Sequence, residues 1–524
     1  MNKISSPNFV ILLADDQAAW TTGYNGHPAA LTPNLDSLAE QGMIFDRHYT
    51  PSPICMSARA TIATGLYEYQ TGCNFEHGRM SRAAFEQSFY ALLRRSGYMT
   101  GYAGKFGFGI ETDESTPTPP HAYDTEESMP VDDFDWWRGF PGQGSYETAR
   151  NETLAHLADE YPHLTRALGH ASGDFFDRAA QEDKPFCLTI GFKAPHDPPA
   201  PDPRFDGVFD EIDFPKPSNY GSAGAEHLSA HIRTGRQWVL FDREWQEDTF
   251  NSSCSKYFQL IHGLDHAVGM VRSELSHRSL EENTVIIFTS DNGYFCGSHH
   301  LGGKVLVYEE ASRVPMLICM PGHSSIGRGQ RIQQVTAHTD IAPTVLDLAG
   351  VEIPEHLDGK SLRPILESPG STVHDTVALL NTWNMPPTQH LAVTDGRYKY
   401  LYYWYTGEGM SPTEELYDID SDSREMNNLT QSPDYSTELQ RMRRAYDDCI
   451  EHIKNTATSH NRYEHYALLF DRKTGWEQKK EIYGSFFDTW ICTIPSWRGG
   501  TWFEDLDLSD YPEEVTYCFG RKRR

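Results

Sequence analysis

The chain has 524 residues, of which 38% are hydrophobic, and a formal net charge of −29 at pH 7. This length allows one large domain with a smaller companion, and no apolar run approaches the roughly 18 to 20 residues that a membrane span needs. So much negative charge would repel nucleic acid and anionic membranes, so neither is expected as a partner. An anionic substrate would need a local basic pocket.

The first apolar run, Phe9 to Ala14, leads directly into acidic residues with no cleavage site behind it. It therefore predicts a strand and not a signal peptide. Nine cysteines are scattered without a C-x-x-C pair, which predicts neither a disulfide framework nor a zinc site and favours a reducing compartment. Two locations stay open: the cytoplasm, or the periplasm or exterior if an export signal has been removed.

Two short apolar runs end abruptly in carboxylates. NFVILLADD covers residues 8–16, and NTVIIFTSDNG covers residues 283–293. Both predict buried parallel strands with polar carboxyl ends, which is where ligands bind in open α/β sheets. Helical patterns lie between them, at residues 32–42, 88–98 and 257–279. This alternation predicts a doubly wound α/β sandwich.

Residues 110–160 lack the alternation and are rich in proline, glycine, aspartate and tryptophan. The stretch is too long for an ordinary connection and predicts an insertion near the active face of a catalytic domain over residues 1–370. Its tryptophans either offer flat faces to sugar rings or aryl groups, or anchor the loop to the core. Short alternating strands at 390–404 and a later helix predict a smaller α+β domain over residues 371–524, with a short antiparallel sheet and a Trp-rich tail.

Asp15, Asp16, Asp291 and Asn292 end the two predicted strands, so they can meet at one edge of a sheet. Three carboxylates and one amide oxygen form a hard, oxygen-only site that suits Ca²⁺, with Mg²⁺ as the alternative, better than zinc. The competing explanation is that each pair only caps the helix or turn that follows it.

The stretch SPICMSARATIATG, residues 52–65, places a cysteine, a serine and an arginine at the start of a helical pattern. The motifs LLADD, CMSARATIATG, GYAGKFGFG, APHDPPAP, TSDNG and GSHHLGGK follow one another along the chain. In these motifs the sequence resembles the formylglycine-dependent sulfatases of the alkaline-phosphatase-like superfamily, over roughly residues 8–430. The resemblance implies the α/β/α sandwich of that superfamily, with a large, mainly parallel sheet, and sulfuric ester hydrolase activity.

The resemblance also implies roles for the motif residues. Cys55 would be oxidised to formylglycine by a maturation enzyme, and an oxygen of the hydrated aldehyde would attack sulfur. Arg59, one helical turn further on, would stabilise that group together with the helix N-terminus. Lys105 and Lys304 would hold the sulfate oxygens, and His196 or Lys304 would protonate the leaving group. Outside such motifs, a lone cysteine is usually a small buried hydrophobe and a lysine a surface residue.

Two positions depart from the family's pattern. Ser57 stands where proline or alanine is usual, at a position that the maturation enzyme reads. Gly107 stands where many members have a histidine that assists breakdown of the sulfated intermediate, so either another residue supplies the base or Lys105 and solvent suffice. His299, in the G-x-H motif, is expected to contact the sulfate or the substrate, with a structural role as the alternative.

The predicted substrate is a sulfated carbohydrate presented as an oligosaccharide or a chain end, because the negative protein would repel a long polyanion. An aryl or alkyl sulfate is the second choice. The rival functions are a phosphonate or phosphate ester hydrolase of the same superfamily, and an inactive sulfatase-like binding protein, which would be expected to lose a ligand or the cysteine. The oligomeric state stays open, and a homo-oligomer is compatible with the sequence.

Overall fold

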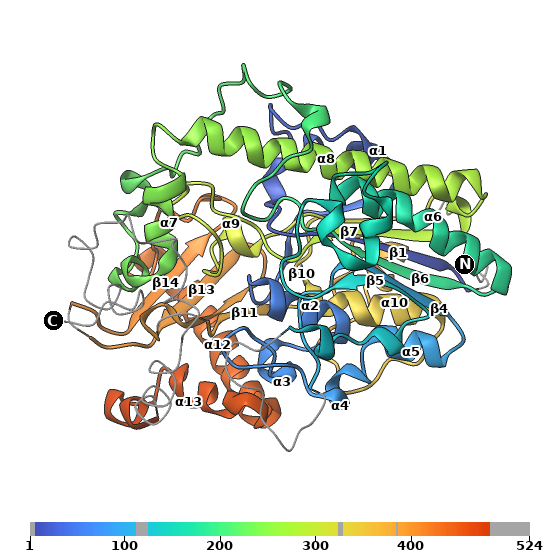
Figure 1. Ribbon diagram of the computed structural model, residues 1–524. Coiled ribbons are helices and arrows are strands. Elements are labelled where there is room, and N and C mark those ends of the chain that lie inside the picture. The colour runs from blue at the N-terminus through green and yellow to red at the C-terminus, as the bar shows by residue number, and fades with distance from the viewer. Residues whose placement is uncertain (1–5, 112–123, 323–327, 384–385, 408, 483–524) are drawn as a thin grey trace.

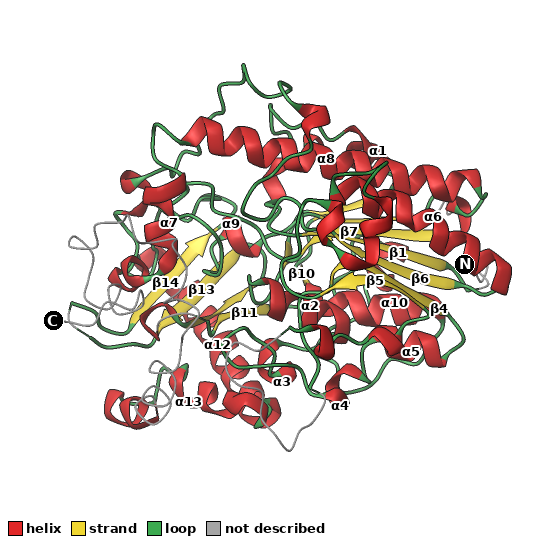
Figure 2. Ribbon diagram, in the orientation of Figure 1, coloured by secondary structure: helices red, strands yellow, loops and turns green. Residues whose placement is uncertain are grey.

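Figure 1 shows the protein, a computed structural model that describes residues 6–111, 124–322, 328–383, 386–407 and 409–482. A large sheet lies between two layers of helices, and a smaller sheet lies beside it with helices against one face (Figure 2). The predicted fold class is confirmed. Among the described residues, no helix is both long enough and apolar enough to cross a membrane.

The large sheet has, within the described residues, eight strands in the order β5-β4-β6-β1-β7-β8-β2-β9. β1 pairs in parallel with β6 and β7, and β4 with β5 and β6, so the carboxyl ends of these five strands lie at one edge. β8 runs antiparallel to both its neighbours. The strands are Asn8–Ala14 (β1), Met43–Phe45 (β2), Met99–Lys105 (β4), Trp136–Phe140 (β5), Phe186–Gly191 (β6), Thr284–Ser290 (β7), Met316–Cys319 (β8) and Gln330–Ile332 (β9). A separate two-stranded sheet pairs His48–Tyr49 (β3) with Thr336–Ala337 (β10).

Helices cover both faces of the large sheet because the side chains of β1 alternate between two cores. Phe9, Ile11 and Leu13 belong to the core shared with α2, α5 and α10, whereas Val10 and Leu12 belong to the core shared with α1, α6 and α8. A strand buried on both faces is the pattern of a doubly wound sheet. The helices are Pro33–Gln41 (α1), Cys55–Thr64 (α2), Glu68–Thr71 (α3), Arg82–Phe85 (α4), Phe89–Arg95 (α5), Leu164–Glu182 (α6), Arg236–Glu244 (α7), Phe250–His277 (α8), Glu309–Ser312 (α9), Ile341–Ala349 (α10), Arg363–Glu367 (α11), Ser436–Thr456 (α12) and Tyr466–Leu469 (α13).

The smaller sheet is antiparallel, in the order β11-β12-β13-β14. Its strands are Val377–Asn381 (β11), His390–Thr394 (β12), Tyr398–Tyr403 (β13) and Thr413–Asp418 (β14). One face packs on α12, where Tyr400 and Leu416 meet Met442. The other face shares a core with Val307 and Tyr308, in the loop before α9. The predicted domain boundary at residue 370 stays a prediction.

Part of residues 110–160 belongs to the large sheet. β5 pairs with β4; Trp136 packs at a tilt against Phe175, and Trp137 stacks on Tyr102. Residues 112–123 of this stretch and the tail from 483 to 524, with its last three tryptophans, lie outside the described residues.

Candidate active site

The candidate site lies at the carboxyl edge of the parallel strands. Asp15 and Asp16 follow β1, Asp291 and Asn292 follow β7, and Lys105 is the last residue of β4. Because β1 and β7 are paired in register, with Ala14 opposite Ser290, the two acidic pairs emerge side by side. This is the edge at which open α/β sheets bind ligands.

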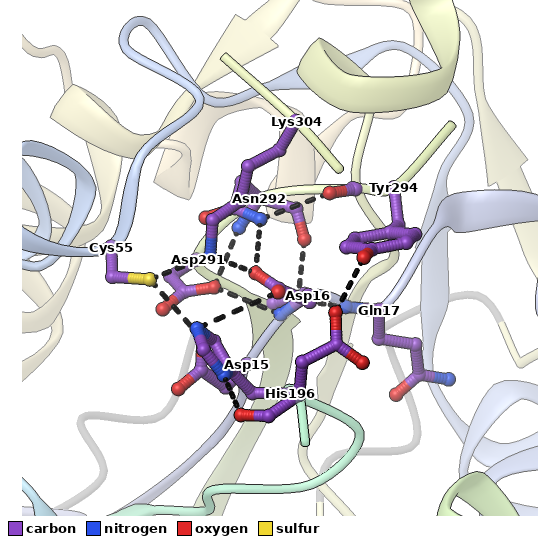
Figure 3. Close-up of polar contacts among 12 residues, drawn as sticks. Asp15, Asp16, Gln17, Cys55, His196, Asp291, Asn292, Tyr294 and Lys304 are labelled. Carbon is purple, nitrogen blue, oxygen red and sulfur yellow. Dashed lines mark hydrogen bonds and ion pairs between the residues drawn. The ribbon is translucent and has the colours of Figure 1, made fainter. Parts of the chain in front are cut away.

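The helix α2 brings a cysteine to this edge. Cys55 is its first residue, and Arg59 lies one turn further along the same face. Cys55 Sγ lies 2.8 Å from Lys304 Nζ and 3.3 Å from Asp15 Oδ1. Figure 3 shows the cysteine among these charged side chains. Burial, followed by the charge of Asp15, raises the pKa of the Cys55 thiol to about 12. The unmodified thiol is therefore a poor nucleophile at neutral pH.

Arg59 links the two acidic strand ends. Its Nε donates to Asp291 Oδ2 at 2.8 Å, and its Nη2 lies 3.5 Å from Asp15 Oδ2. Its Nη1 donates to the backbone carbonyl of Lys105 at 2.6 Å. Burial alone would lower the pKa of Arg59, but Asp291 and Asp15 outweigh it and raise that pKa. The guanidinium is thus a permanent positive charge that fixes three strand ends.

The three carboxylates and the amide are arranged like ligands of a cation. Burial raises the pKa of Asp16 to about 7, opposed by Lys304 and reinforced by the other two carboxylates. Burial also raises the pKa of Asp291, whereas the cations around Asp15 outweigh its burial and hold its pKa well below the usual range. Asn292 Oδ1 is buried without a hydrogen-bond partner in the described structure. Mutual repulsion and an unsatisfied amide oxygen fit a bound divalent cation.

Two lysines lie near the cysteine and its neighbouring carboxylates. Lys105 Nζ lies 2.5 Å from Asp15 Oδ2, and Lys304 Nζ forms an ion pair with Asp16. Burial alone would lower the pKa of each lysine, but the nearby carboxylates outweigh it and raise both values. Both side chains are therefore cations at neutral pH and can bind the oxygens of an anion.

His196 faces the same space from the loop after β6. Its Nδ1 donates to the backbone carbonyl of Asp197 at 2.6 Å, and its Nε2 lies 3.8 Å from Asp16 Oδ2. Burial lowers the pKa of His196 well below the usual range, so the ring is neutral. Four of the grouped residues, Asp15, Asp16, Cys55 and His196, place one ligand atom each within 4.8 Å of one another.

His299 has different surroundings. The ring is fully buried, its Nδ1 donates to the Gly224 carbonyl at 3.0 Å, and its Nε2 accepts from Asn219 Nδ2 at 2.9 Å. It is absent from the lining of the cavity over Cys55. A contact with substrate would require this ring to leave its buried partners.

Both departures from the sulfatase pattern have local structural reasons. Gly107 has a φ of +85°, and a Cβ built there would lie 2.5 Å from Arg59 Cδ, so a histidine has no room beside that arginine. Ser57 is buried, and its Oγ donates to the Cys73 carbonyl at 2.9 Å.

A cavity of about 620 Å³ opens over Cys55. Its aromatic lining comes from Phe75, Tyr146, Tyr294 and Trp383, and not from the tryptophans of β5. A cavity of this volume matches the size of small-ligand pockets.

Sequence analysis missed several polar residues of this cavity, and two of them bear on the argument. Gln143, which follows β5, accepts a hydrogen bond from Lys105 Nζ at 2.6 Å through its Oε1. Lys193, which follows β6, is buried and has its pKa lowered to about 8 by that burial. The available signal for Lys193 was its place three residues before His196. Gln143 belongs to no motif, so the sequence offered no signal for it.

Comparison with known proteins identifies the family. The sulfatase family model matches residues 7–351, and a model for the C-terminal part of N-sulphoglucosamine sulphohydrolase matches residues 297–452. The N-acetylglucosamine-6-O-sulfatase of Bacteroides thetaiotaomicron is 25% identical over 520 residues, covering 86% of this chain and 87% of that protein. The human N-acetylglucosamine-6-sulfatase is 30% identical over 384 residues, covering 69% of this chain and 64% of that protein.

Two solved structures share the fold. A protein in complex with its substrate D-glucosamine-2-N,6-O-disulfate gives a TM-score of 0.69 at 23% identity, over 87% of this chain and 99% of that one. The phosphonate monoester hydrolase of Agrobacterium radiobacter gives a TM-score of 0.69 at 22% identity, over 86% of this chain and 96% of that one. Since the sulfatase model spans more than half of the sequence, the chain belongs to the sulfatase family of the alkaline-phosphatase-like superfamily and is a sulfuric ester hydrolase.

Proposed function

We propose that this sulfatase removes a sulfate monoester from a sugar presented as a short oligosaccharide or a chain end. A single cavity of about 620 Å³ has room for one or two sugar rings. Phe75 and Trp383 line it and offer the apolar faces on which sugar rings stack. Two of the relatives are named as N-acetylglucosamine 6-sulfatases, which supports a carbohydrate substrate.

The position of Cys55 is the observation that carries the proposal. It begins a buried helix, contacts Lys304 and Asp15, and lines the cavity. We propose that a maturation enzyme converts it to formylglycine. One oxygen of the hydrated side chain attacks sulfur and forms a sulfate ester, and the other later expels sulfate by re-forming the aldehyde. The N-terminus of α2 favours negative charge at this position.

The proposed metal site consists of Asp15, Asp16, Asp291 and Asn292, with Ca²⁺ as the cation and Mg²⁺ as the alternative. When bound, the cation would supply Lewis-acid stabilisation of negative oxygens. Arg59 keeps two of the carboxylates in place. Elemental analysis of the purified protein should find about one Ca²⁺ or Mg²⁺ per chain. Stoichiometric zinc held by these residues would contradict the assignment.

The remaining cations have distinct proposed tasks. Lys105 and Lys304 bind the non-bridging oxygens of the sulfate, because both ammonium groups lie beside the carboxylates next to Cys55. His196 or Lys304 protonates the leaving oxygen. The Lys304 ammonium already carries a proton, whereas the neutral His196 ring holds its proton on Nδ1, so His196 can act only after its Nε2 has taken up a proton in the substrate complex. A substrate contact of His299 stays a prediction.

The test is a substrate screen. It uses protein in which mass spectrometry of the peptide containing Cys55 has detected formylglycine. Sulfated mono-, oligo- and polysaccharides are compared with nitrophenyl sulfate and a phenyl phosphonate, following released sulfate or phosphonate cleavage. We expect the short sugars to react fastest. Equal desulfation of intact polymer would contradict the chain-end assignment, and a preference for nitrophenyl sulfate would indicate an arylsulfatase. Cleavage of the phosphonate alone would support the second candidate, a phosphonate ester hydrolase, which the shared fold of the Agrobacterium enzyme favours.

A further inference from the structure

The charged groups around the nucleophile balance one another without a fourth cationic side chain. Three carboxylates face three cationic side chains there: Asp15, Asp16 and Asp291 against Arg59, Lys105 and Lys304. A divalent cation would add two positive charges, and an ionised nucleophile with a sulfate monoester would supply two negative ones. Desolvated charges are stable only when they are paired in this way.

Lys193 is a further cation in the same cavity. Among the described residues it forms no ion pair, and Asp15, Asp16 and Asp197 act on its charge only from a greater distance. Its side chain lines the cavity, and the residue is only 3% exposed. Its Nζ donates one hydrogen bond, to the Asp197 carbonyl at 3.2 Å, and lies 5.0 Å from the centre of the Tyr146 ring. Within the part of the chain that the structure describes, no carboxylate oxygen lies within 4.0 Å of this atom. Buried Lys399, by contrast, has carboxylate oxygens at 2.8 and 2.9 Å.

The backbone holds Lys193 in this position. The His196 amide donates to the Lys193 carbonyl at 2.9 Å, and Tyr146 Oη donates to the carbonyls of both residues, at 3.3 and 2.8 Å. Lys193 therefore stays beside the histidine proposed to face the leaving oxygen. An ammonium group has three donors, and burying it with two of them unused is costly unless a ligand accepts them.

We propose that Lys193 binds a second anionic group of the substrate: a sulfate, sulfamate or carboxylate on the sugar that carries the scissile sulfate or on the adjoining one. The inference rests on the proposed function and narrows its substrate class to sugars with at least two negative charges. The scissile sulfate is already served by Lys105 and Lys304. Lys193 lies outside that group of ion pairs and is free to bind a neighbouring anion.

The test measures binding in Cys55→Ala protein, which cannot turn over substrate. Isothermal titration compares glucosamine 6-sulfate with glucosamine 2-N,6-O-disulfate, and a 6-sulfated disaccharide with a uronate distinguishes a carboxylate from a sulfamate. We expect the doubly charged sugar to bind about 10- to 100-fold more tightly, with a preference that shrinks as salt is added.

Adding Lys193→Met should reduce this preference to within about 3-fold, because the side chain keeps its length but loses its charge. Lys193→Arg should keep most of the preference. Lys216→Met is the matched control, since Lys216 is exposed and pairs with Glu247 outside the cavity; it should leave the preference unchanged.

The inference would be overturned if neither the disulfate nor the uronate disaccharide bound more tightly than glucosamine 6-sulfate, if Lys193→Met weakened all three sugars by the same factor, or if no sugar bound. If Lys193→Met does not fold, the absence of any preference in the chain with its native Lys193 would still overturn the inference. Binding to Cys55→Ala protein does not depend on turnover. The proposed function fails separately, if formylglycine-bearing protein releases sulfate from neither the sugars nor nitrophenyl sulfate.

Discussion

The catalytic edge and the interface between the two sheets both bury clusters of charge, yet they differ in where the partners come from. At the interface, Lys399 Nζ on β13 lies 2.8 Å from Glu309 and 2.9 Å from Glu425, and the chain alone supplies these partners. At the catalytic edge, Asn292 Oδ1 has no donor and Lys193 no carboxylate within the described structure. Burial alone therefore does not distinguish a structural charge from a functional one. A buried charge whose partner is missing from the protein is the one that awaits a ligand.

The largest expected effect separates chemistry from folding at the catalytic edge. Cys55→Ser should lower sulfate release by at least about 10³-fold, because a serine sulfate ester cannot leave by re-forming an aldehyde. Its thermal unfolding midpoint should stay close to that of the unchanged chain. Cys449→Ser, a half-buried cysteine of α12, is the control and should keep activity. Intact mass would reveal any trapped sulfate ester, and an active Cys55→Ser protein would rule out the mechanism.

At the interface between the two sheets, replacing one buried residue should lower the stability of the protein and leave its activity intact. Lys399→Met should lower the free energy of unfolding by about 3–5 kcal/mol, because two buried carboxylates lose their shared cation. Turnover per folded molecule should persist. Lys473→Met, an exposed lysine 3.1 Å from Asp447, should cost at most about 1 kcal/mol in urea unfolding. Equal stabilities of the two variants would show that the interface cluster is not structural.

A pH series sharpens the comparison through Glu415, a buried carboxylate with no ion-pair partner among the described residues. Burial raises the pKa of Glu415 to about 7, opposed by donors from Tyr308 and Tyr417. Since the folded pKa lies above the ordinary value of 4.5, the stabilisation is complete below about pH 4.5 and is lost as pH rises to about 7. Between pH 4.5 and 8 this group should cost roughly 3 kcal/mol of unfolding free energy.

Glu415→Gln should remove that part of the pH dependence, whereas Glu464→Gln, an exposed glutamate, should not. Urea unfolding at several pH values measures the difference. Parallel pH profiles for the unchanged chain and Glu415→Gln would show that the carboxyl does not titrate in this range.

The smallest expected effect concerns the hydrogen bond from Lys105 to Gln143. Gln143→Ala should lower kcat/KM about 10-fold, because the lysine loses the acceptor that orients it. The metal content and the unfolding midpoint of Gln143→Ala should stay unchanged. The control is Gln478→Ala, at an exposed position, which should change neither kcat/KM nor metal content nor unfolding midpoint. A loss of stability in step with activity would assign Gln143 to the fold alone.

The sequence predicted the elements whose patterns are long or strongly apolar. The run at 283–293 contains β7 and its acidic end, and the helical pattern at 257–279 lies almost wholly within α8, Phe250–His277. Strands as short as β2 and β9 carry too few residues for a pattern, and β5 lay inside a stretch interpreted as an insertion. Their places depend on pairing with distant strands, which the local sequence does not encode.

The residues of the candidate site likewise fall into those that the sequence predicted and those that it missed. Residues at strand ends within motifs, such as Asp15 and Cys55, could be chosen from sequence because chemistry and spacing coincide. Lys193 has one sequence signal, its place three residues before His196, and Gln143 has none. Their significance comes from what surrounds them: Lys193 forms no ion pair among the described residues, and Gln143 meets Lys105 only through the pairing of β4 with β5.

The burial of α2 limits when Cys55 can be reached by another protein. All ten residues of the helix are buried, and Cys55 itself is 1% exposed. Under the proposed conversion of Cys55 to formylglycine, a maturation enzyme would have to reach that segment while it is still extended. Chains that folded first would then keep their thiol, and the active fraction of a preparation would depend on the relative rates of modification and folding.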